Sequence, residues 1–375
     1  MNSDFRVPSG VRFSYTIYDM TITFILPSLE IAGGVRTVFE LSNQLSLRGL
    51  HIRIVHCAIS PWNELGLNQR PKEIFRRLYQ NSRSIWQTKR GEWFSPLFAE
   101  TIRIPRLRAR YFPPSDILIA TAWPTAEEIM KADVGKERKF YFIQGYEVCH
   151  GPEERVKDTY KLPLRRIVIS SFLKGVLKTE IGVDSLGPVF MGINFSEFNL
   201  NARGATSFGR IGMLYHRHPL KGVKDGLRAF EIAQRFYPNI QLVMFGAHRR
   251  PLDLPYHVEF HHNVSREDLK RVYGSCSIWL VPSLLEGFCL IPMEAMACGC
   301  AVVSTRIGGI DDYAIPGETV LVSNPGDVNG LAANIMTLLN DKNLLLKIAG
   351  NSYQHIQSFS WTKAASNFLN CLSIN

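Results

Sequence analysis

The stretch that decides the fold runs Ser277-Ile-Trp-Leu-Val281-Pro-Ser-Leu-Leu-Glu286-Gly-Phe-Cys-Leu-Ile-Pro-Met-Glu294-Ala-Met-Ala-Cys-Gly299. Its first five residues form a short, mostly apolar run that predicts a buried strand, and Leu290–Ala297 predicts a buried helix. A strand, a loop and a helix in this order are typical of one βα unit in a parallel sheet. Glu286 therefore follows the carboxyl end of a strand, and Glu294 lies inside the next helix.

The same alternation of strands and helices extends over most of the chain and predicts parallel βαβ units. Further strands are predicted at Thr21–Leu26, His51–Cys57, Asp116–Ala120, Lys139–Ile143, Arg166–Ser170, Arg210–Leu214, Gln241–Phe245, Val258–Phe260, Ala301–Ser304 and Thr319–Val322. Further helices are predicted at Val35–Leu47, Thr125–Lys131, Ser171–Thr179 (with Ser170 or Ser171 as N-cap), Val223–Arg235, Arg266–Tyr273 and Val328–Leu339. A linker is predicted between Gly187 and Gly204. The 375 residues therefore predict two doubly wound α/β domains.

Composition narrows the class of protein. The apolar fraction of 46% and the charged fraction of 20% are those of a globular protein. The apolar runs are too short to cross a bilayer, and residues 1–20 lack the apolar core of a signal peptide. Seven cysteines, mostly set among apolar residues, favour a reducing cytoplasm over a disulfide framework. Cys298 and Cys300 have no second Cys or His pair at zinc spacing, so we expect a cytoplasmic protein without a metal site.

The net charge of +10 is concentrated in residues 70–110, where eleven Lys or Arg stand against three Glu. Aromatic and aliphatic residues interleave with these basic side chains, which suits an anionic membrane surface or an anionic ligand. An ordinary solvated face is the alternative. No nucleic-acid-binding motif accompanies the charge, so we do not expect nucleic acid as a partner.

Three loops carry residues suited to binding an anion. Gly33 and Gly34 precede a helix and let the backbone approach a phosphate, although the spacing is not that of a dinucleotide site and a plain turn is the alternative. Arg217 and Lys221 follow strand Arg210–Leu214, where they suit a diphosphate; a solvated basic loop is the alternative. The amides of Phe288–Leu290 open a helix between the two carboxylates. Glu294, in an apolar helix, needs a buried partner.

The segment from Glu286 to Glu294 resembles the E-x7-E signature of retaining GT-B glycosyltransferases, in particular glycosyltransferase family 4. The resemblance extends through Ala301–Gly309, Asp311–Tyr313 and Val320–Ser323, and is strongest over residues 205–340. It implies two Rossmann-like domains facing across a cleft. The implied parts are an N-terminal extension (1–19), an acceptor domain (20–195), a nucleotide-sugar domain (196–356) and a helix (357–375), starting near Trp361, that crosses back to the first domain.

The resemblance also implies roles for single residues. Glu294 would bind the donor ribose, and Glu286 the transferred sugar. The diphosphate would be held by Arg217, Lys221 and the amides of Phe288, Cys289 and Leu290, with Gly33 and Gly34 as a further phosphate contact, while backbone near Phe260–Asn263 would meet the base. Transfer to a glycan or lipid-linked acceptor in cell-surface polysaccharide synthesis would proceed by front-face displacement, in which the leaving phosphate takes the acceptor's proton. No Asp-x-Asp motif is present, so no metal is implied.

Two departures from the family pattern affect the site. Gly212-Met213 stands where the family often has Gly-Arg, and Arg217 is the candidate replacement. The run Thr121-Ala-Trp123-Pro lacks the His that many relatives carry there. The candidates for the acceptor side are Trp123, Gln144, Tyr146 and Glu147.

The run Gln144–Glu147 and the pattern over Ile31–Leu45 are similar to those of some rhamnosyltransferases, which favours a deoxysugar donor. Two other functions fit the same architecture. One is a nucleotide-sugar epimerase of the hydrolysing type, and the other is a non-catalytic sugar-nucleotide-binding protein.

Overall fold

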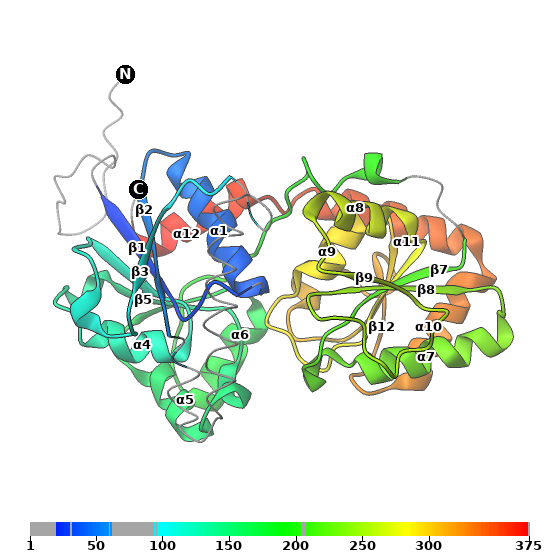
Figure 1. Ribbon diagram of the computed structural model, residues 1–375, viewed down its shortest axis with the longest axis horizontal. Coiled ribbons are helices and arrows are strands. Elements are labelled where there is room, and N and C mark those ends of the chain that lie inside the picture. The colour runs from blue at the N-terminus through cyan, green and yellow to red at the C-terminus, as the bar shows by residue number, and fades with distance from the viewer. Residues whose placement is uncertain are drawn as a thin grey trace. The chain divides into compact units, whose positions relative to one another are not determined.

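The structure is a computed structural model that describes residues 20–30, 32–59, 61, 94, 96–203 and 208–373. The chain forms two compact units, one made of Met1–Val189 with Trp361–Asn375 and the other of Phe190–Ser360 (Figure 1). Residues 1–19, and most of the predicted basic segment (70–93 and 95), lie outside the described residues. No helix in the described part of the chain is both long and apolar enough to span a bilayer.

The first unit is built on a six-stranded sheet whose described neighbours all pair in parallel. In spatial order the strands are β3 (Glu100–Ile104), β2 (His51–Cys57), β1 (Thr21–Leu26), β4 (Ile117–Ala120), β5 (Lys139–Ile143) and β6 (Arg165–Val168). The helices are α1 (Gly33–Ser46), α4 (Trp123–Met130), α5 (Glu153–Lys161), α6 (Ser171–Val176) and α12 (Trp361–Leu372). Residues in the central strand β4 are all buried, as expected for a parallel strand covered on both faces.

The second unit repeats this plan. Its strands, again in parallel and in spatial order, are β12 (Val320–Ser323), β11 (Ala301–Thr305), β10 (Ile278–Val281), β7 (Arg210–Leu214), β8 (Gln241–Gly246) and β9 (Glu259–His262). Its helices are α7 (Val223–Phe236), α8 (Arg266–Ser275), α9 (Leu290–Ala297), α10 (Val328–Asn340) and α11 (Lys342–Ile356). The prediction of two doubly wound α/β domains is confirmed.

Each sheet has the strand order of a Rossmann fold, in which the chain winds outward in both directions from a central pair. The direction of winding reverses between β1 and β4 in the first unit and between β7 and β10 in the second. Sheets of this kind bind ligands beyond the carboxyl ends of the strands, at this topological switch point. The loops that follow these four strands are therefore where a site is expected.

The last helix of the chain, α12, belongs to the first unit. Figure 1 shows it, in red, beside the blue α1. Phe368 packs its ring against Phe24 of β1 and Phe142 of β5, with centroids 5.8 and 5.2 Å apart. Arg48, just after α1, donates to the carbonyl oxygen of Thr362 at 2.7 Å. An apolar stripe on this helix thus completes the core of a unit whose other residues all lie at or before Val189.

Several element predictions were wrong in detail. Strand β3 was not predicted, because it lies at the edge of the sheet and alternates polar with apolar residues. Helices α5 and α11 were also missed, and only three residues of the very polar α5 are buried. Strand β6 ends at Val168 rather than Ser170, because Ser170 already caps α6 by accepting a hydrogen bond from the Leu173 amide at 3.1 Å. That cap confirms the predicted N-terminus.

Candidate functional site

The switch point of the second unit holds an ion pair. Lys221 ends the loop after β7, and Glu286 lies in the loop after β10. The Lys221 ammonium donates to both carboxylate oxygens of Glu286, at 2.6 and 2.9 Å, and the Ser283 hydroxyl donates to the same carboxylate at 2.9 Å. The two paired side chains are 29% and 11% exposed. The structure therefore brings together two residues that the sequence placed in separate motifs.

A glycine allows the two loops to approach this closely. Gly222, directly after Lys221, has φ +61°, and a Cβ there would lie 1.8 Å from the carbonyl oxygen of Pro282. The Leu284 amide also donates to the Leu220 carbonyl at 2.7 Å, which ties the loops together. Any larger residue at 222 would clash with backbone, so the position of Lys221 against Glu286 depends on this glycine.

Electrostatics keep the lysine charged and a neighbouring histidine neutral. Burial by itself lowers the pKa of Lys221, but the charge of Glu286 outweighs it, so that the pKa is raised. Burial and then the nearby Lys221 lower the pKa of His216 to about 4. His216 is therefore neutral at physiological pH, and its Nδ1 accepts from the His218 amide at 3.0 Å. Arg217, exposed in the same loop, makes no hydrogen bond or ion pair with a described residue.

The predicted anion site at the start of α9 has an unusual backbone. Cys289, the residue before the helix, adopts φ +71° and ψ 103°, a conformation that side chains other than glycine rarely take. The first-turn amides of a helix have no partner within the helix, and they favour a negative charge. Burial, and then Glu286, raise the pKa of the Cys289 thiol well above its ordinary value. This thiol is therefore not a thiolate nucleophile.

Glu294 has the buried partner that its apolar helix required. Its side chain is fully buried in α9, and the Tyr273 hydroxyl of α8 donates to its Oε2 at 2.8 Å. The Tyr273 ring in turn packs on Trp279 of β10, with centroids 4.5 Å apart. Glu294 is thus held in place by α8, which packs against α9. Its assignment to the donor ribose stays a prediction.

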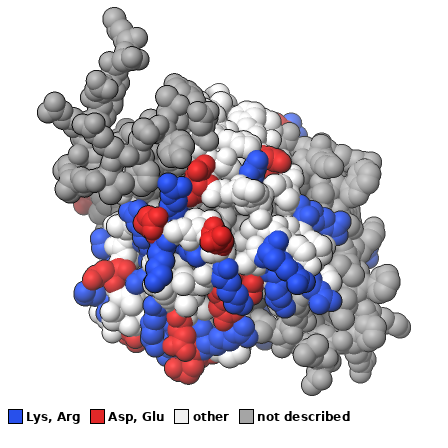
Figure 2. Space-filling view, turned by 90° about the vertical axis from the view of Figure 1, so that its left-hand side faces the viewer, with Lys and Arg blue, Asp and Glu red and all other residues white. Residues whose placement is uncertain are grey.

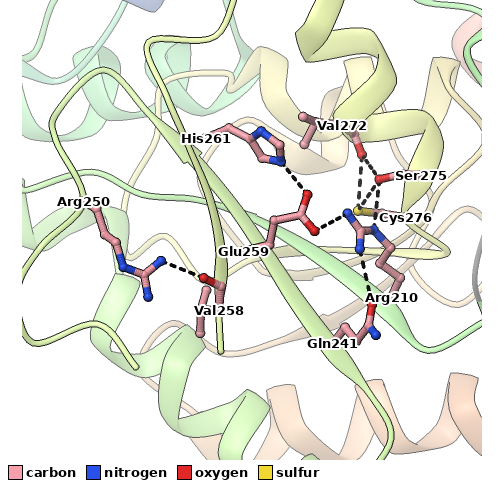
Figure 3. Close-up of polar contacts among 9 residues, drawn as sticks. All are labelled: Arg210, Gln241, Arg250, Val258, Glu259, His261, Val272, Ser275 and Cys276. Carbon is pink, nitrogen blue, oxygen red and sulfur yellow. Dashed lines mark hydrogen bonds and ion pairs between the residues drawn. The ribbon is translucent and has the colours of Figure 1, made fainter. Parts of the chain in front are cut away.

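The strand predicted to approach the base, β9, is anchored by a polar cluster at the opposite end of the sheet. Figure 3 shows Arg210 at its centre, donating to Glu259 at 2.7 Å, to Ser275 at 3.1 Å and to Gln241 at 3.3 Å. His261 lies 2.6 Å from the second Glu259 oxygen. Arg210, Gln241 and Glu259 each begin a strand, so the cluster aligns β7, β8 and β9 and leaves their carboxyl ends for ligand.

The first unit places two glycines and a glutamine at its switch point. Gly33 and Gly34 begin α1, directly after β1, and neither has a positive φ. No described atom lies within 4 Å of a Cβ built on Gly33, whereas one on Gly34 would lie 3.4 Å from Oε1 of Gln144. That Gln144 oxygen is buried and has no hydrogen-bond partner among the described residues. Gln144 thus lies against the glycine pair, with one acceptor unused.

Glu147 follows β5 and is a carboxyl group whose pKa is strongly raised. Its Oε2 accepts from the Tyr141 hydroxyl at 2.8 Å and from the Trp123 amide at 2.9 Å. Burial raises its pKa to about 7, although the hydrogen bonds from Tyr141 and Trp123 act in the opposite direction. The structure thus joins Glu147 to Trp123, whose own side chain is fully buried, while Tyr146 stacks on Tyr160 with centroids 6.0 Å apart.

Comparisons with known proteins agree with this geometry. Residues 209–355 match the family model described as "Glycosyl transferases group 1". The D-inositol 3-phosphate glycosyltransferase of Corynebacterium efficiens is 36% identical over 100 residues, covering 27% of this chain and 24% of that protein. The first curated relatives are matched over about a quarter to a third of their length.

Similar solved structures extend over both units. Sucrose-phosphate synthase from Thermosynechococcus elongatus has a TM-score of 0.69 at 19% identity, over 94% of this chain and 98% of that one. Anabaena HepE in complex with UDP-glucose has a TM-score of 0.66 at 15% identity, over 94% and 99%. The chain has the GT-B fold. The segment that matches the family model contains Lys221, Glu286 and Glu294.

Sequence reasoning missed four residues that contact or lie near the candidate site residues: Tyr141 in the first unit, and Ser283, Tyr273 and Tyr313 in the second. Tyr313 is fully buried, its ring centroid is 5.0 Å from that of Phe288, and its hydroxyl has no hydrogen-bond partner among the described residues. The glycine at position 309 marks a close approach of two loops, because a Cβ there would be 2.6 Å from the Gly287 carbonyl oxygen. Tyr313 thus packs against Phe288, which lies between Glu286 and the start of α9.

Proposed function

We propose that this protein is a retaining glycosyltransferase. It transfers a hexosyl or deoxyhexosyl group from a nucleoside-diphosphate donor to a hydroxyl of a glycan or lipid-linked acceptor in cell-surface polysaccharide synthesis. The observation that carries the proposal is the Lys221–Glu286 pair, which lies at the switch point of the second unit and directly before α9. A cation, a carboxylate and a helix N-terminus together suit a ligand that combines a diphosphate with a sugar.

The donor is assigned to the second unit. Lys221, Arg217 and the amides of Phe288, Cys289 and Leu290 bind the diphosphate, Glu286 binds hydroxyls of the transferred sugar, and Glu294 binds the ribose. Gly33 and Gly34, in the first unit, give a further phosphate close access to backbone. HepE, which shares the fold, was solved with UDP-glucose, and this supports a nucleotide sugar as the donor.

When the donor binds, Lys221 and Glu286 each exchange the other for a group of the donor. In the structure, Lys221 and Glu286 neutralise each other. With donor, Lys221 turns to the diphosphate and Glu286 to the sugar hydroxyls, so neither charge is left alone in a partly buried site. Because Glu286 outweighs the effect of burial on the pKa of Lys221, the ammonium is fully charged when the donor arrives.

Transfer proceeds by front-face displacement without a metal. The acceptor oxygen bonds to the anomeric carbon on the face from which the diphosphate leaves, so the anomeric configuration is retained. The electron pair of the broken C–O bond stays on the diphosphate, which takes the acceptor's proton. Negative charge grows on the diphosphate through the transition state, and the Lys221 ammonium and the amides of α9 stabilise it there.

The acceptor is assigned to the first unit, beside Trp123, Gln144, Tyr146 and Glu147.

We also propose that the protein works in the cytoplasm at the inner face of the membrane, docked through residues 70–110. Figure 2 shows a face of the first unit on which described Lys and Arg side chains are intermixed with Asp and Glu. The proposed docking is therefore argued from the excess of Lys and Arg in the sequence of residues 70–110. Neutralising Arg76, Arg77, Lys89 and Arg90 should release the protein from anionic liposomes; unchanged sedimentation would refute docking.

The test of function begins with a thermal-shift screen of UDP, GDP, dTDP and ADP, because a ligand that binds only the folded state raises its melting temperature. The corresponding sugar nucleotides are then incubated with glycan acceptors, and the product linkage is determined by NMR. An α-linked product from an α-linked donor supports retention, and inversion would contradict it. Isomerised donor without acceptor would identify an epimerase, and binding without turnover a non-catalytic protein.

A further inference from the structure

Glu147 presents one carboxylate oxygen for a ligand. Both hydrogen bonds that the structure gives this carboxylate, from the Trp123 amide and the Tyr141 hydroxyl, go to Oε2. Oε1 makes no hydrogen bond with a described residue, and Glu147 as a whole is half-buried rather than buried. Oε1 is therefore the carboxylate oxygen left to accept from a ligand, in the segment that follows β5.

A rigid aromatic stack holds this carboxylate in place. Tyr160 of α5 lies between Tyr141 and Tyr146, with ring centroids 5.7 and 6.0 Å away and interplanar angles of 14° and 18°. The Glu147 amide donates to the Tyr160 hydroxyl at 2.8 Å. Hydrogen bonds to Tyr160 and Tyr141 thus fix both the backbone and the side chain of Glu147, and Tyr146, the preceding residue, is half-buried on the same stack. A preorganised group of this kind binds a ligand without first losing its own conformational freedom.

We propose that Glu147 binds the acceptor by accepting, through Oε1, a hydrogen bond from a hydroxyl group of an uncharged sugar. This inference rests on the proposed glycosyltransferase function and adds the class of acceptor group that the first unit selects. A carboxylate is a strong acceptor for a sugar hydroxyl, and it repels a uronic acid or phosphate at the same position. The nearby Tyr146 ring offers apolar surface to the carbon face of a sugar.

The groups around Glu147 make this interaction depend on pH. The titratable side chains hydrogen-bonded to it are Tyr141 of β5, the strand before it, and Tyr160 of α5, while α4 contributes the Trp123 amide. Burial raises the pKa of both tyrosines, so they stay neutral. Arg155, whose guanidinium lies 5.1 Å from the Trp123 ring centroid, is paired through two hydrogen bonds with Glu127. Among the described residues, burial is the main cause of the carboxyl pKa of about 7, and the hydrogen bonds from Tyr141 and Trp123 oppose it.

The sign of the effect follows from the two protonation states. The ionised carboxylate accepts the sugar hydroxyl strongly, whereas a proton on the carboxyl competes for the same oxygens. Acceptor binding therefore weakens as the pH falls through about 7, the pKa of Glu147. Above that pH the acceptor KM is constant, and below it the KM rises by up to about tenfold per pH unit.

The experiment measures acceptor KM at saturating sugar nucleotide from about pH 5.5 to 8.5 for wild type, Glu147→Gln and Glu147→Asp. The amide of Glu147→Gln keeps an oxygen for the Trp123 amide but carries no charge. We expect its acceptor KM to rise about tenfold at pH 8 and to lose its pH dependence, with donor KM unchanged. Glu147→Asp should keep a pH dependence and bind more weakly. Glu153→Gln, an exposed carboxylate of α5, serves as the matched control and should behave as wild type.

Several outcomes would overturn the inference. An acceptor KM of Glu147→Gln equal to that of wild type would do so, as would a wild-type acceptor KM that is constant between about pH 6 and 8. The second result needs no variant and therefore decides the matter even if Glu147→Gln fails to fold. A carboxylated or phosphorylated sugar that competes better than its neutral counterpart would also contradict it. Failure of the proposed function is distinct, since wild type would then transfer no sugar at any pH.

Discussion

The two switch points have the same topology and opposite chemistry. In the second unit the loops after the central strands bring a lysine against a glutamate, directly before a helix N-terminus. In the first unit the equivalent loops carry two glycines and a buried tryptophan, and the neighbouring strand adds one carboxyl group with a pKa of about 7. The strand order thus decides where a ligand lies, and the loop residues decide which ligand it is.

This contrast explains why one unit was easier to interpret from sequence. Charged side chains in a loop are few and stand out in a sequence, as do Lys221, proposed to bind the diphosphate, and Glu286, proposed to bind the sugar. An acceptor subsite for a sugar needs only hydroxyl partners and aromatic surface, which ordinary cores also contain. The predictions below separate the two chemistries, beginning with the largest expected effect.

Replacing Glu294 should remove donor use. Glu294→Ala deletes the proposed ribose contact, and it also leaves the Tyr273 hydroxyl without its partner inside the protein. We expect no detectable transfer and no thermal shift with any nucleotide. Tyr273→Phe, which keeps the carboxylate, should cost only about 1 kcal/mol of stability. Wild-type donor affinity in Glu294→Ala would show that this carboxylate is purely structural.

Replacing Lys221 should slow transfer more than it weakens binding. Its charge is needed most when the diphosphate departs, so Lys221→Ala should lower kcat by about 10²–10³-fold with a smaller change in donor KM. Steady-state kinetics measure both constants. Lys224→Ala, on the exposed side of α7, is the matched control and should retain wild-type rates. A change confined to KM would mean that Lys221 acts in ground-state binding alone.

The glycines of the two units should respond differently to alanine. Gly222→Ala places a side chain in a left-handed conformation and against the Pro282 carbonyl, so we expect a loss of about 2–4 kcal/mol in the free energy of unfolding. Gly33→Ala meets no described atom and should change it by less than about 0.5 kcal/mol. Urea unfolding measures both. Equal losses would show that Gly33 also has a structural constraint.

Replacing two buried tyrosines with phenylalanine should give the smallest difference in stability. Tyr141→Phe removes a hydrogen bond to Glu147, so it should cost about 1–2 kcal/mol and raise the pKa of Glu147 further, because that bond lowers it. Tyr313→Phe removes a buried hydroxyl that has no partner among the described residues, so stability should stay equal or increase slightly. Thermal melting compares them, and a Tyr313→Phe loss as large as that of Tyr141→Phe would reveal a hidden partner.

Local sequence patterns were sufficient to predict most of the strands and the position of the candidate donor site. Short apolar runs such as Ile278–Val281 predicted the central strands, because a parallel strand covered on both faces must be apolar throughout. The spacing of Glu286 and Glu294 about the start of α9 predicted the donor side, since a loop and the helix after it are contiguous. The polar α5 and the edge strand β3 escaped because their patterns are weak, and tertiary contacts stabilise them.

Tertiary structure alone decided which of these groups meet. Lys221 and Glu286 are 65 residues apart, and only the adjacency of β7 and β10 brings their loops together. Tyr273 as the partner of Glu294, and Tyr141 with Trp123 around Glu147, likewise follow from packing between elements. A sequence shows that a buried carboxylate needs a hydrogen-bond donor, but the donor is chosen by three-dimensional proximity, which no local pattern encodes.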